Sequence, residues 1–268
     1  MKNRAGKHIR TGCMDTASAR IYYEIYGEGI PLLMLHGKAG SHREFHSYAN
    51  QMSSHYQVIL MDSRGHGRSR LKRKSARREF TASDMAEDVR LLLGRLRLER
   101  AILLGFSDGA NTALEFAAHY PDRTMAVISI SGNARPSGLC LPVYLFMTAK
   151  YHMAGLLGRI CPTRRMRRMF GQSRIFASLI VNSPALTGER LRQIKAPVLL
   201  IAGTMDLIKV SHTKWMAANI PGSQLILMKG GTHGAFFRER GIYLKCIVDF
   251  LDRWGLYTRP FCVRLNTH

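Results

Sequence analysis

The chain has 268 residues, of which 46% are hydrophobic and 22% are charged, so it can bury a sizeable core and is not a disordered tail. Its longest stretches without a charged residue, 136–149 and 175–188, have 14 residues each and are too short to span a bilayer. Asp15 follows the basic N-terminus before any apolar run, so we expect no secretory signal. Five cysteines without CxxC spacing argue against a disulfide scaffold or a zinc module and favour a cytoplasmic protein.

Positive charge is concentrated in three segments. The net charge is +22, from 40 Lys and Arg against 18 Asp and Glu, and segments 1–10, 64–78 and 159–174 contain no acidic residue. One interpretation is an anionic partner such as nucleic acid, a membrane surface or an acidic substrate, and the other is solvated basic loops in an arginine-rich composition. No nucleic-acid-binding motif accompanies the charge, so we expect no specific nucleic-acid partner.

Short apolar runs recur along the chain and predict buried strands. They are continuous rather than alternating, which is typical of strands covered on both faces in a parallel sheet. Segment 20–26 alternates apolar and polar residues and predicts an earlier strand. The continuous runs are 32–35, 58–61, 101–104, 126–130, 198–201 and 225–228.

Helical spacing lies between the predicted strands. Apolar residues from 85 to 96 recur at three- and four-residue intervals, and Thr81 and Asp84 predict a capping box at the start of this helix. Further helices are predicted over 110–118, 211–219 and 238–254. Strands that alternate with helices in this way indicate an open α/β sheet.

One interval breaks this alternation. Between 130 and 198 the chain has helical and basic character but no clear strand. We expect this insertion to form a cap over the C-terminal edge of the sheet, where ligands bind in open α/β folds. Its apolar stretch 139–147 can be interpreted either as a surface that contacts an acyl group or as a helix that packs on the core.

The strongest functional signal is Gly105-Phe106-Ser107-Asp108-Gly109, which follows a predicted strand and opens a predicted helix. This is the context that the G-x-S-x-G nucleophile elbow requires. Glycines are needed because a sharp strand-to-helix turn leaves no room for neighbouring Cβ atoms, and the free N–H groups of the helix N-terminus point at developing negative charge. The sequence therefore predicts Ser107 as a nucleophile, against the alternative of an ordinary glycine-rich turn.

A nucleophilic serine needs a base, and the base needs a carboxylate that orients it. Asp206 follows the predicted strand 198–201, and His233 follows the predicted strand 225–228, at the sheet edge expected to carry Ser107. We expect His233 to accept the serine proton and Asp206 to fix the tautomer of the imidazole. The alternatives are a turn histidine and a solvated loop carboxylate.

An oxyanion hole needs two N–H donors. The amide of Asp108, directly after the nucleophile, is expected to be one of them. The loop after strand 32–35 is expected to supply the other, and Lys38 is the candidate through its amide rather than its side chain. His36, in the same loop, is expected to be structural.

Taken together, these motifs resemble the α/β-hydrolase superfamily in its capped, carboxylesterase-like branch of serine hydrolases. His36-Gly37, a D-x-R-G-x-G-x-S stretch at 62–69, the elbow, Asp206 and His233 follow one another within residues 20–254. The resemblance implies an α/β-hydrolase fold, with a mostly parallel central sheet flanked by helices and a helical cap inserted after the sixth strand. The implied parts are a core of 19–132 and 191–256 and a cap of 133–190, with tails of 1–18 and 257–268 whose order the sequence leaves open.

The resemblance implies a serine hydrolase that cleaves a carboxylic ester of a small substrate through an acyl-enzyme on Ser107, without a metal or organic cofactor. A lactonase or C–C bond hydrolase with the same triad is an alternative, whereas a serine at the elbow disfavours dehalogenase and epoxide-hydrolase members. An alternative of another class is a non-catalytic protein that binds an anionic partner through its basic segments. The sequence leaves the oligomeric state open.

Two other features bear on function. His42 and His46 are spaced like a zinc-binding pair, but they are not part of an H-E-x-x-H motif, so a satisfied or exposed pair of helix histidines is favoured. Segments 64–78 and 159–174 are expected to project from the sheet edge that carries Ser107. There they would form a cationic rim that attracts anionic substrates or anionic lipid.

Overall fold

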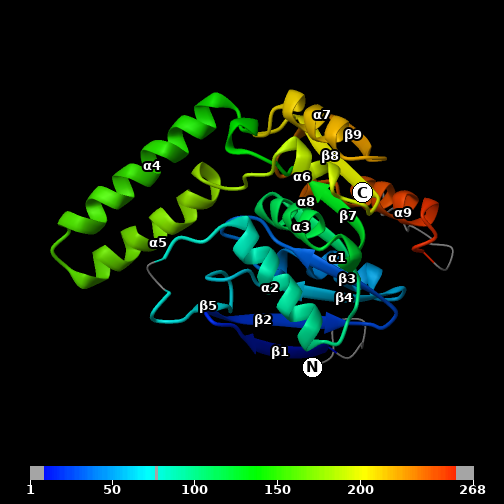
Figure 1. Cartoon of the computed structure of the whole chain (residues 1–268), viewed down its shortest axis with the longest axis horizontal. Coiled ribbons are helices and arrows are strands. Elements are labelled where there is room, and N and C mark those ends of the chain that lie inside the picture. Colours follow the sequence, from blue (N-terminus) through cyan, green and yellow to red (C-terminus); the bar gives the residue numbers. More distant parts are fainter. Residues whose placement is uncertain (1–8, 76–77, 258–268) are drawn as a thin grey trace.

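A nine-stranded sheet forms the centre of the molecule (Figure 1). The computed structural model describes residues 9–75 and 78–257. In spatial order the strands are β1 (Ile9–Asp15), β2 (Ala19–Tyr26), β4 (Tyr56–Met61), β3 (Ile30–Leu35), β6 (Ala101–Phe106), β7 (Thr124–Ile130), β8 (Val198–Met205) and β9 (Gln224–Thr232), and β5 (Arg70–Leu71) pairs with β2. Neighbouring strands from β4 to β9 are parallel, whereas β2 is antiparallel to β1, β4 and β5. The prediction of a mostly parallel sheet is confirmed.

The seven strands predicted from apolar runs all lie within observed strands. The observed strands β8 and β9 exceed their predicted ranges the most, because they remain paired beyond their apolar runs, as far as Met205 opposite Thr232. The apolar runs therefore locate the strands, and backbone pairing sets where they end.

Strand β1 corrects one expectation. Residues 1–18 are expected to be a tail, but Ile9–Asp15 pair residue by residue with Arg20–Tyr26 at the edge of the sheet. Its residues are mostly exposed or half-buried, as an edge strand allows, so the segment lacks the apolar run of an inner strand. The remaining tail segments, 1–8 and 258–268, lie outside the described residues.

Helices cover both faces of the sheet. One face is covered by α2 (Ala82–Arg95), α3 (Asp108–His119), α6 (Gly188–Arg192) and α7 (Val210–Asn219), and the other by α1 (His46–Met52), α8 (Ala235–Arg238) and α9 (Arg240–Arg253). The predicted capping box at the start of α2 is present, with Thr81 and Asp84 each bonding the backbone of the other. These layers bury the inner parallel strands on both sides, which is why their sequences are continuously apolar. Strand β9 lies at the edge of the sheet and its apolar run 225–228 is only half-buried, so the prediction of a buried strand is wrong there.

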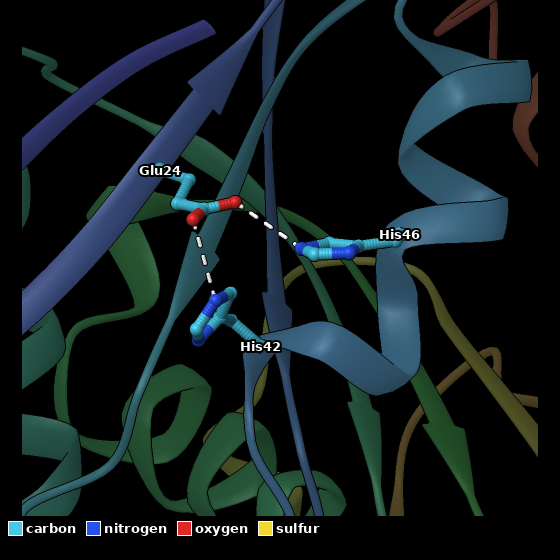
Figure 2. A group of neighbouring side chains, drawn as sticks. All are labelled: Glu24, His42 and His46. Atoms are coloured by element: carbon cyan, nitrogen blue, oxygen red, sulfur yellow. Dashed lines mark hydrogen bonds and ion pairs between the residues drawn. The ribbon is translucent and has the colours of Figure 1, made fainter. Parts of the chain in front are cut away.

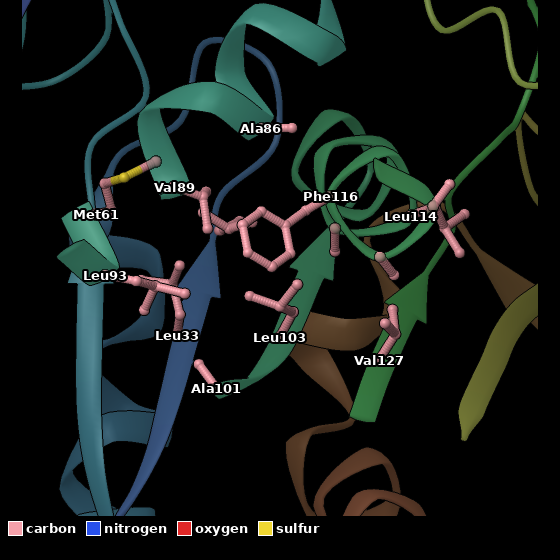
Figure 3. Packing of buried hydrophobic residues seen from close by; sticks show 14 of the residues in the cluster. Leu33, Met61, Ala86, Val89, Leu93, Ala101, Leu103, Leu114, Phe116 and Val127 are labelled. Carbon is pink, nitrogen blue, oxygen red and sulfur yellow. The ribbon is translucent and has the colours of Figure 1, made fainter. Parts of the chain in front are cut away.

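The core between the sheet and α2–α3 shows how side chains alternate between the two faces (Figure 3). Leu33, Leu103 and Val127 point from three adjacent strands toward Val89 of α2 and Phe116 of α3, and all five are fully buried. Each such side chain contributes roughly 1.5–3 kcal/mol to folding. This packing fixes the strand that ends at Ser107 and the helix that begins after it.

The predicted insertion forms a helical hairpin of α4 (Leu141–Ile160) and α5 (Arg164–Val181), which extends away from the sheet in Figure 1. It follows β7, which is the seventh strand in chain order and the sixth when the two-residue β5 is left aside. Within residues 9–75 and 78–257, no helix has both the length and the apolar character needed to cross a membrane.

Candidate active site

The elbow lies between β6 and α3, and its backbone explains its glycines. Ser107 has φ 53° and ψ −119°, in the left-handed region that non-glycine residues rarely adopt. A Cβ on Gly105 would overlap the backbone of Gly109, and a Cβ on Gly109 would overlap the carbonyl of Leu35. The predicted turn is therefore present, and it holds the half-buried Ser107 at the C-terminal edge of the sheet.

Three predicted residues form one hydrogen-bonded chain. The Oγ atom of Ser107 lies 3.1 Å from Nε2 of His233, and Nδ1 of His233 lies 2.7 Å from Oδ1 of Asp206. The ring of Phe106 packs against the imidazole with its centroid 5.1 Å away, which restricts the orientation of the ring. These contacts join the ends of β6, β8 and β9, as the strand order requires.

Asp206 is held by more than His233. Its side chain is fully buried, Oδ2 accepts a hydrogen bond of 2.6 Å from Oγ of Ser131, and Oδ1 accepts one of 3.2 Å from the amide of Ile208. Burial favours the neutral acid, but the hydrogen bonds from His233 and Ser131 outweigh it and hold the pKa of Asp206 below its usual range. Asp206 is therefore ionised near neutral pH.

The sequence analysis does not identify Ser131. This residue directly follows β7 and, like Ser107, has a positive φ of 53°. The sequence feature that could identify Ser131 is its position at the carboxyl end of a parallel strand, β7, which lies between β6 and β8. A serine in that position has many ordinary roles, so the position alone does not predict a function.

The loop after β3 passes close to the nucleophile. A Cβ on Gly37 would lie 3.2 Å from Cβ of Ser107 and 3.0 Å from the ring of Phe106, so this loop approaches the elbow as closely as a glycine permits. Lys38 comes next in the loop, and Asp108 is the first residue of α3, whose N–H has no acceptor within the helix. Lys38 thus follows the glycine that approaches Ser107, and Asp108 follows Ser107 itself.

Two charged side chains lie beside these amides. The carboxyl of Asp108 is buried, and burial raises its pKa to about 6 although Lys38 and His233 oppose the shift. Burial also lowers the pKa of the Lys38 ammonium to about 8. Oδ1 of Asp108 accepts from Asn111 at 3.4 Å, whereas Oδ2 is buried and has no hydrogen-bond partner within the described part of the chain. The motifs predict a role for the amides of these two residues and none for their side chains.

The D-x-R-G-x-G-x-S stretch is structural. Asp62 accepts hydrogen bonds from the amides of His42 and Arg68, and Ser69 donates to the carbonyl of Asp62. The guanidinium of Arg64 is buried and bonds both carboxylate oxygens of Asp88 at 2.7 and 2.9 Å. The expectation that segment 64–78 projects as a cationic rim is therefore wrong for Arg64.

The structural role expected for His36 is confirmed. Its Nε2 accepts a hydrogen bond of 3.0 Å from the amide of Ser63. Burial lowers the pKa of His36 to about 4, so the ring is neutral near pH 7 and can accept this bond.

Glu24, His42 and His46 form a second polar cluster (Figure 2). Nε2 of His42 and Nε2 of His46 lie 3.3 and 3.2 Å from the two carboxylate oxygens of Glu24, and one ligand atom from each of the three lies within 4.8 Å of the others. The set could hold a metal ion by its chemistry and spacing. Both oxygens of Glu24 already accept hydrogen bonds from Tyr22 and Tyr26 at 2.7 and 2.6 Å, however.

His42 has a second partner on its other side. Its Nδ1 lies 2.8 Å from Oδ1 of Asp62. Burial opposes a charge on His42, but hydrogen bonds to Asp62 and Glu24 prevail and raise its pKa to about 9. The contacts of this cluster are thus accounted for by a protonated His42 that lies between the carboxylates of Glu24 and Asp62.

Comparison with known proteins agrees with the fold. A family model described as the alpha/beta hydrolase fold matches residues 30–156. The chain is similar to the AB hydrolase superfamily protein YisY of Bacillus subtilis (25% identity, covering 86% of this chain and 94% of that protein). It is also similar to the serine hydrolase BPHL of Mus musculus (26% identity, covering 92% and 88%). Among solved structures, the carboxylesterase CesB (YbfK) of Bacillus subtilis superimposes with a TM-score of 0.72 at 19% identity, over 91% and 92% of the two chains.

Proposed function

The chain belongs to the α/β-hydrolase superfamily, and we propose that it is a serine hydrolase that cleaves a carboxylic ester of a small substrate through an acyl-enzyme on Ser107. The observation that carries the proposal is the hydrogen-bonded chain from Ser107 through His233 to Asp206. A serine hydrolase among the relatives and a carboxylesterase among the structures of the same fold support it.

The first half of the reaction forms the acyl-enzyme. Oγ of Ser107 attacks the ester carbonyl carbon while Nε2 of His233 takes its proton, and ionised Asp206 stabilises the imidazolium. The carbonyl oxygen becomes an oxyanion that accepts hydrogen bonds from the amides of Lys38 and Asp108. The tetrahedral intermediate then collapses, and the alcohol leaves with the proton that His233 returns.

The second half releases the acid. A water molecule gives a proton to His233 and attacks the acyl carbon, and the new tetrahedral intermediate expels Oγ of Ser107, which recovers the proton. Every step uses side chains and amides of this chain, so the proposed mechanism requires neither a metal nor an organic cofactor. We propose that these groups belong to a core of 19–132 and 191–256, and that residues 133–190 form a cap.

The proposal also covers the charge of the substrate. The exposed arginines at the start of α5 and the ammonium of Lys38 support an anionic substrate, because a positive field raises the encounter rate of an anion. Esters of equal size, with and without a carboxylate, distinguish this. The anionic ester should have the higher kcat/KM at low salt, and the advantage should shrink as salt is added. Equal, salt-independent values would remove this part of the proposal.

A fluorophosphonate probe tests the nucleophile directly. Wild-type protein is treated beside Ser107→Ala, and the modified peptide is located by mass spectrometry. Ser129→Ala is the matched control, because its buried hydroxyl lacks a hydrogen-bond partner within the described chain and is not part of the triad. Labelling at Ser107 that is lost only in Ser107→Ala is expected. A folded wild-type protein that is not labelled would favour a non-catalytic binding protein.

A substrate panel then separates the reaction classes. Short-chain esters, lactones and C–C bond substrates are compared with wild-type protein and Ser107→Ala. Ester turnover above lactone and C–C turnover is expected. Preferential lactone or C–C cleavage that depends on Ser107 would retain the triad but replace the proposed ester substrate.

A further inference from the structure

One side of α4 exposes most of the large apolar side chains of the helix to solvent. With 3.6 residues per turn, its exposed large apolar residues fall within an arc of about 140°. They include Phe146 and Ile160, which are 67% and 65% exposed. We call this surface the outer face of α4, and its residues are Leu141, Leu145, Phe146, Met153, Leu156 and Ile160.

The outer face is turned away from the rest of the molecule. Met147 and Ala154 are the buried residues of α4 and lie on the opposite side of the helix, where Met147 contacts the ammonium of Lys38 at 3.8 Å. A Cβ on Gly155 would contact Arg174, and a Cβ on Gly158 would contact Phe170, so the side next to these glycines faces α5. Segment 139–147 can be interpreted as packing on the core or as contacting an acyl group. Neither interpretation explains why the outer face of α4 is apolar.

The hairpin is held in this orientation from its inner side. Ile175 and Leu179 of α5 pack against Phe80 and Met85 next to and within α2. The guanidinium of Arg174 lies 2.8 Å from Glu79, which also accepts a hydrogen bond from Tyr151 of α4. Since α5 and the inner side of α4 make these contacts, the outer face is left without a partner among the described residues (Figure 1).

Positive charge borders this apolar surface. Residues 124–188 contain no Asp or Glu. The last turn of α4 and the first five residues of α5 carry exposed arginines, and none of them forms an ion pair with any carboxylate that the structure describes. We call this group the arginine tip, and its residues are Arg159, Arg164, Arg165, Arg167 and Arg168.

We propose that the outer face of α4 and the arginine tip dock on the surface of an anionic phospholipid bilayer. Apolar side chains on one side of a helix, bordered by arginines, are the combination by which a helix lies in the interface of a charged membrane. The arginines bind lipid phosphates, and the leucine, phenylalanine and isoleucine side chains enter the boundary between headgroups and acyl chains. The chain then lies on the membrane and does not span it.

The properties of this surface favour an anionic bilayer over a second copy of the chain and over nucleic acid. A second copy seated on the same face would bring two arginine tips together, and like charges oppose that association. Nucleic acid would neutralise the arginines but leave Phe146 and Ile160 in water. An anionic bilayer offers phosphates to the arginine tip and an apolar boundary to the outer face of α4.

Docking has a geometric consequence for the active site. The side of α4 opposite the outer face reaches Lys38, which follows β3 beside Ser107. The bilayer and the active-site loop would therefore lie on opposite sides of a single helix. The inference does not depend on turnover, so it can fail or hold independently of the proposed hydrolase activity.

Vesicle co-sedimentation of the full chain tests the proposal. The probes are phosphatidylcholine vesicles and vesicles that contain about one-third phosphatidylserine, at low and high salt. Wild-type protein should bind the mixed vesicles at least tenfold more than the neutral ones, with the difference reduced by salt. Equal binding to both, or no binding to either, would overturn the proposal.

Paired variants separate the surface from the net charge. Arg164→Glu with Arg168→Glu should lower binding to the mixed vesicles about tenfold or more, whereas Arg43→Glu with Arg95→Glu makes the same change in net charge on exposed arginines elsewhere and should lower it far less. Leu145→Ser with Leu156→Ser should also lower binding, unlike Ile242→Ser on α9. Equal losses in a variant and its control would overturn the assignment.

The oligomeric state of the wild-type protein is a separate test. A dimer that dissociates in the variant Leu145→Ser with Leu156→Ser would assign the face to a second copy instead. Circular dichroism establishes that each variant is folded.

Discussion

The carbonyl oxygen of Leu35 occupies the space that a side chain on Gly109 would need. Leu35 is the last residue of β3 and Gly109 is the second residue of α3, so the helix that starts at the elbow lies directly against the neighbouring strand end. This contact brings the loop that follows β3 beside Ser107. The glycine is thus a condition for placing the loop of Lys38, the proposed oxyanion donor, next to Ser107, the proposed nucleophile.

Gly109→Ala is therefore expected to destabilise the protein by about 3 kcal/mol or more, because backbone atoms must move to admit the methyl group. Gly94→Ala in α2 is the control, since its methyl group would meet nothing within 4 Å and alanine is favoured in a helix by about 0.5–1 kcal/mol. Urea unfolding followed by circular dichroism measures both. Similar unfolding midpoints would contradict the role given to Gly109.

Ser131→Ala removes the 2.6 Å hydrogen bond to Oδ2 of Asp206. A hydrogen bond to a charged group contributes about 1.5–3 kcal/mol, so we expect kcat for an ester to fall by about tenfold or more while KM changes little. Asp206→Asn should be far more severe, with a loss on the order of 10⁴-fold in kcat, because the asparagine favours the wrong tautomer of His233. Equal losses in the two variants would show that Ser131 does more than position Asp206.

Asp108→Asn should stabilise the protein at neutral pH. Burial raises the pKa of Asp108 to about 6 from an ordinary value of 3.8, so ionisation of this group opposes folding above pH 6 and has no effect below about pH 4. Relative to wild type, Tm of the variant should rise by several degrees at pH 7.5, which corresponds to about 3 kcal/mol at most, and the gain should vanish at pH 4. A gain that is the same at both pH values would rule out ionisation as its cause.

His42 should make stability depend on pH in the alkaline range. Its pKa is raised to about 9 in the folded protein, so its contribution is complete below pH 6.5 and is lost as the pH rises through 9. Wild-type Tm should fall between pH 6.5 and 9 more steeply than that of His42→Gln, measured by differential scanning calorimetry.

The same samples test a metal ion at this cluster. A protonated His42 cannot ligate a metal, so a chelator should leave Tm unchanged at pH 7. A rise in Tm on addition of Zn²⁺ that disappears in His46→Ala would instead assign Glu24, His42 and His46 to a metal site.

Local chemistry explains which parts of the site could be predicted from the sequence. The elbow could be predicted because a single turn requires both Gly105 and Gly109. His233 and Asp206 could be predicted because each directly follows a strand with an apolar run. Ser131 also follows a strand, but its partner is 75 positions away and a serine carries no pattern of its own.

Other features depend on tertiary contacts that periodicity does not contain. Strand β1 is an exposed edge, so its residues show no apolar run even though they pair fully with β2. Arg64 belongs to a basic segment, but its buried contact with Asp88 of α2 is not visible in composition. The outer face of α4 is apolar like a core helix, and only the packing of the opposite side shows that it faces solvent.

The strand ends that meet at Ser107 have a consequence for the synthesis of the chain. Ser107 and His233 are 126 positions apart, and the strands β6, β7, β8 and β9 that supply the site are added to the sheet in that order along the chain. Under the proposed mechanism, a nascent chain that has reached β8 would hold the nucleophile and the carboxylate but no base. Since domains fold as units, the serine would stay unreactive until the last parallel strand docks. Onset of hydrolysis during translation would therefore mark completion of the sheet, and partly made chains would not consume substrate.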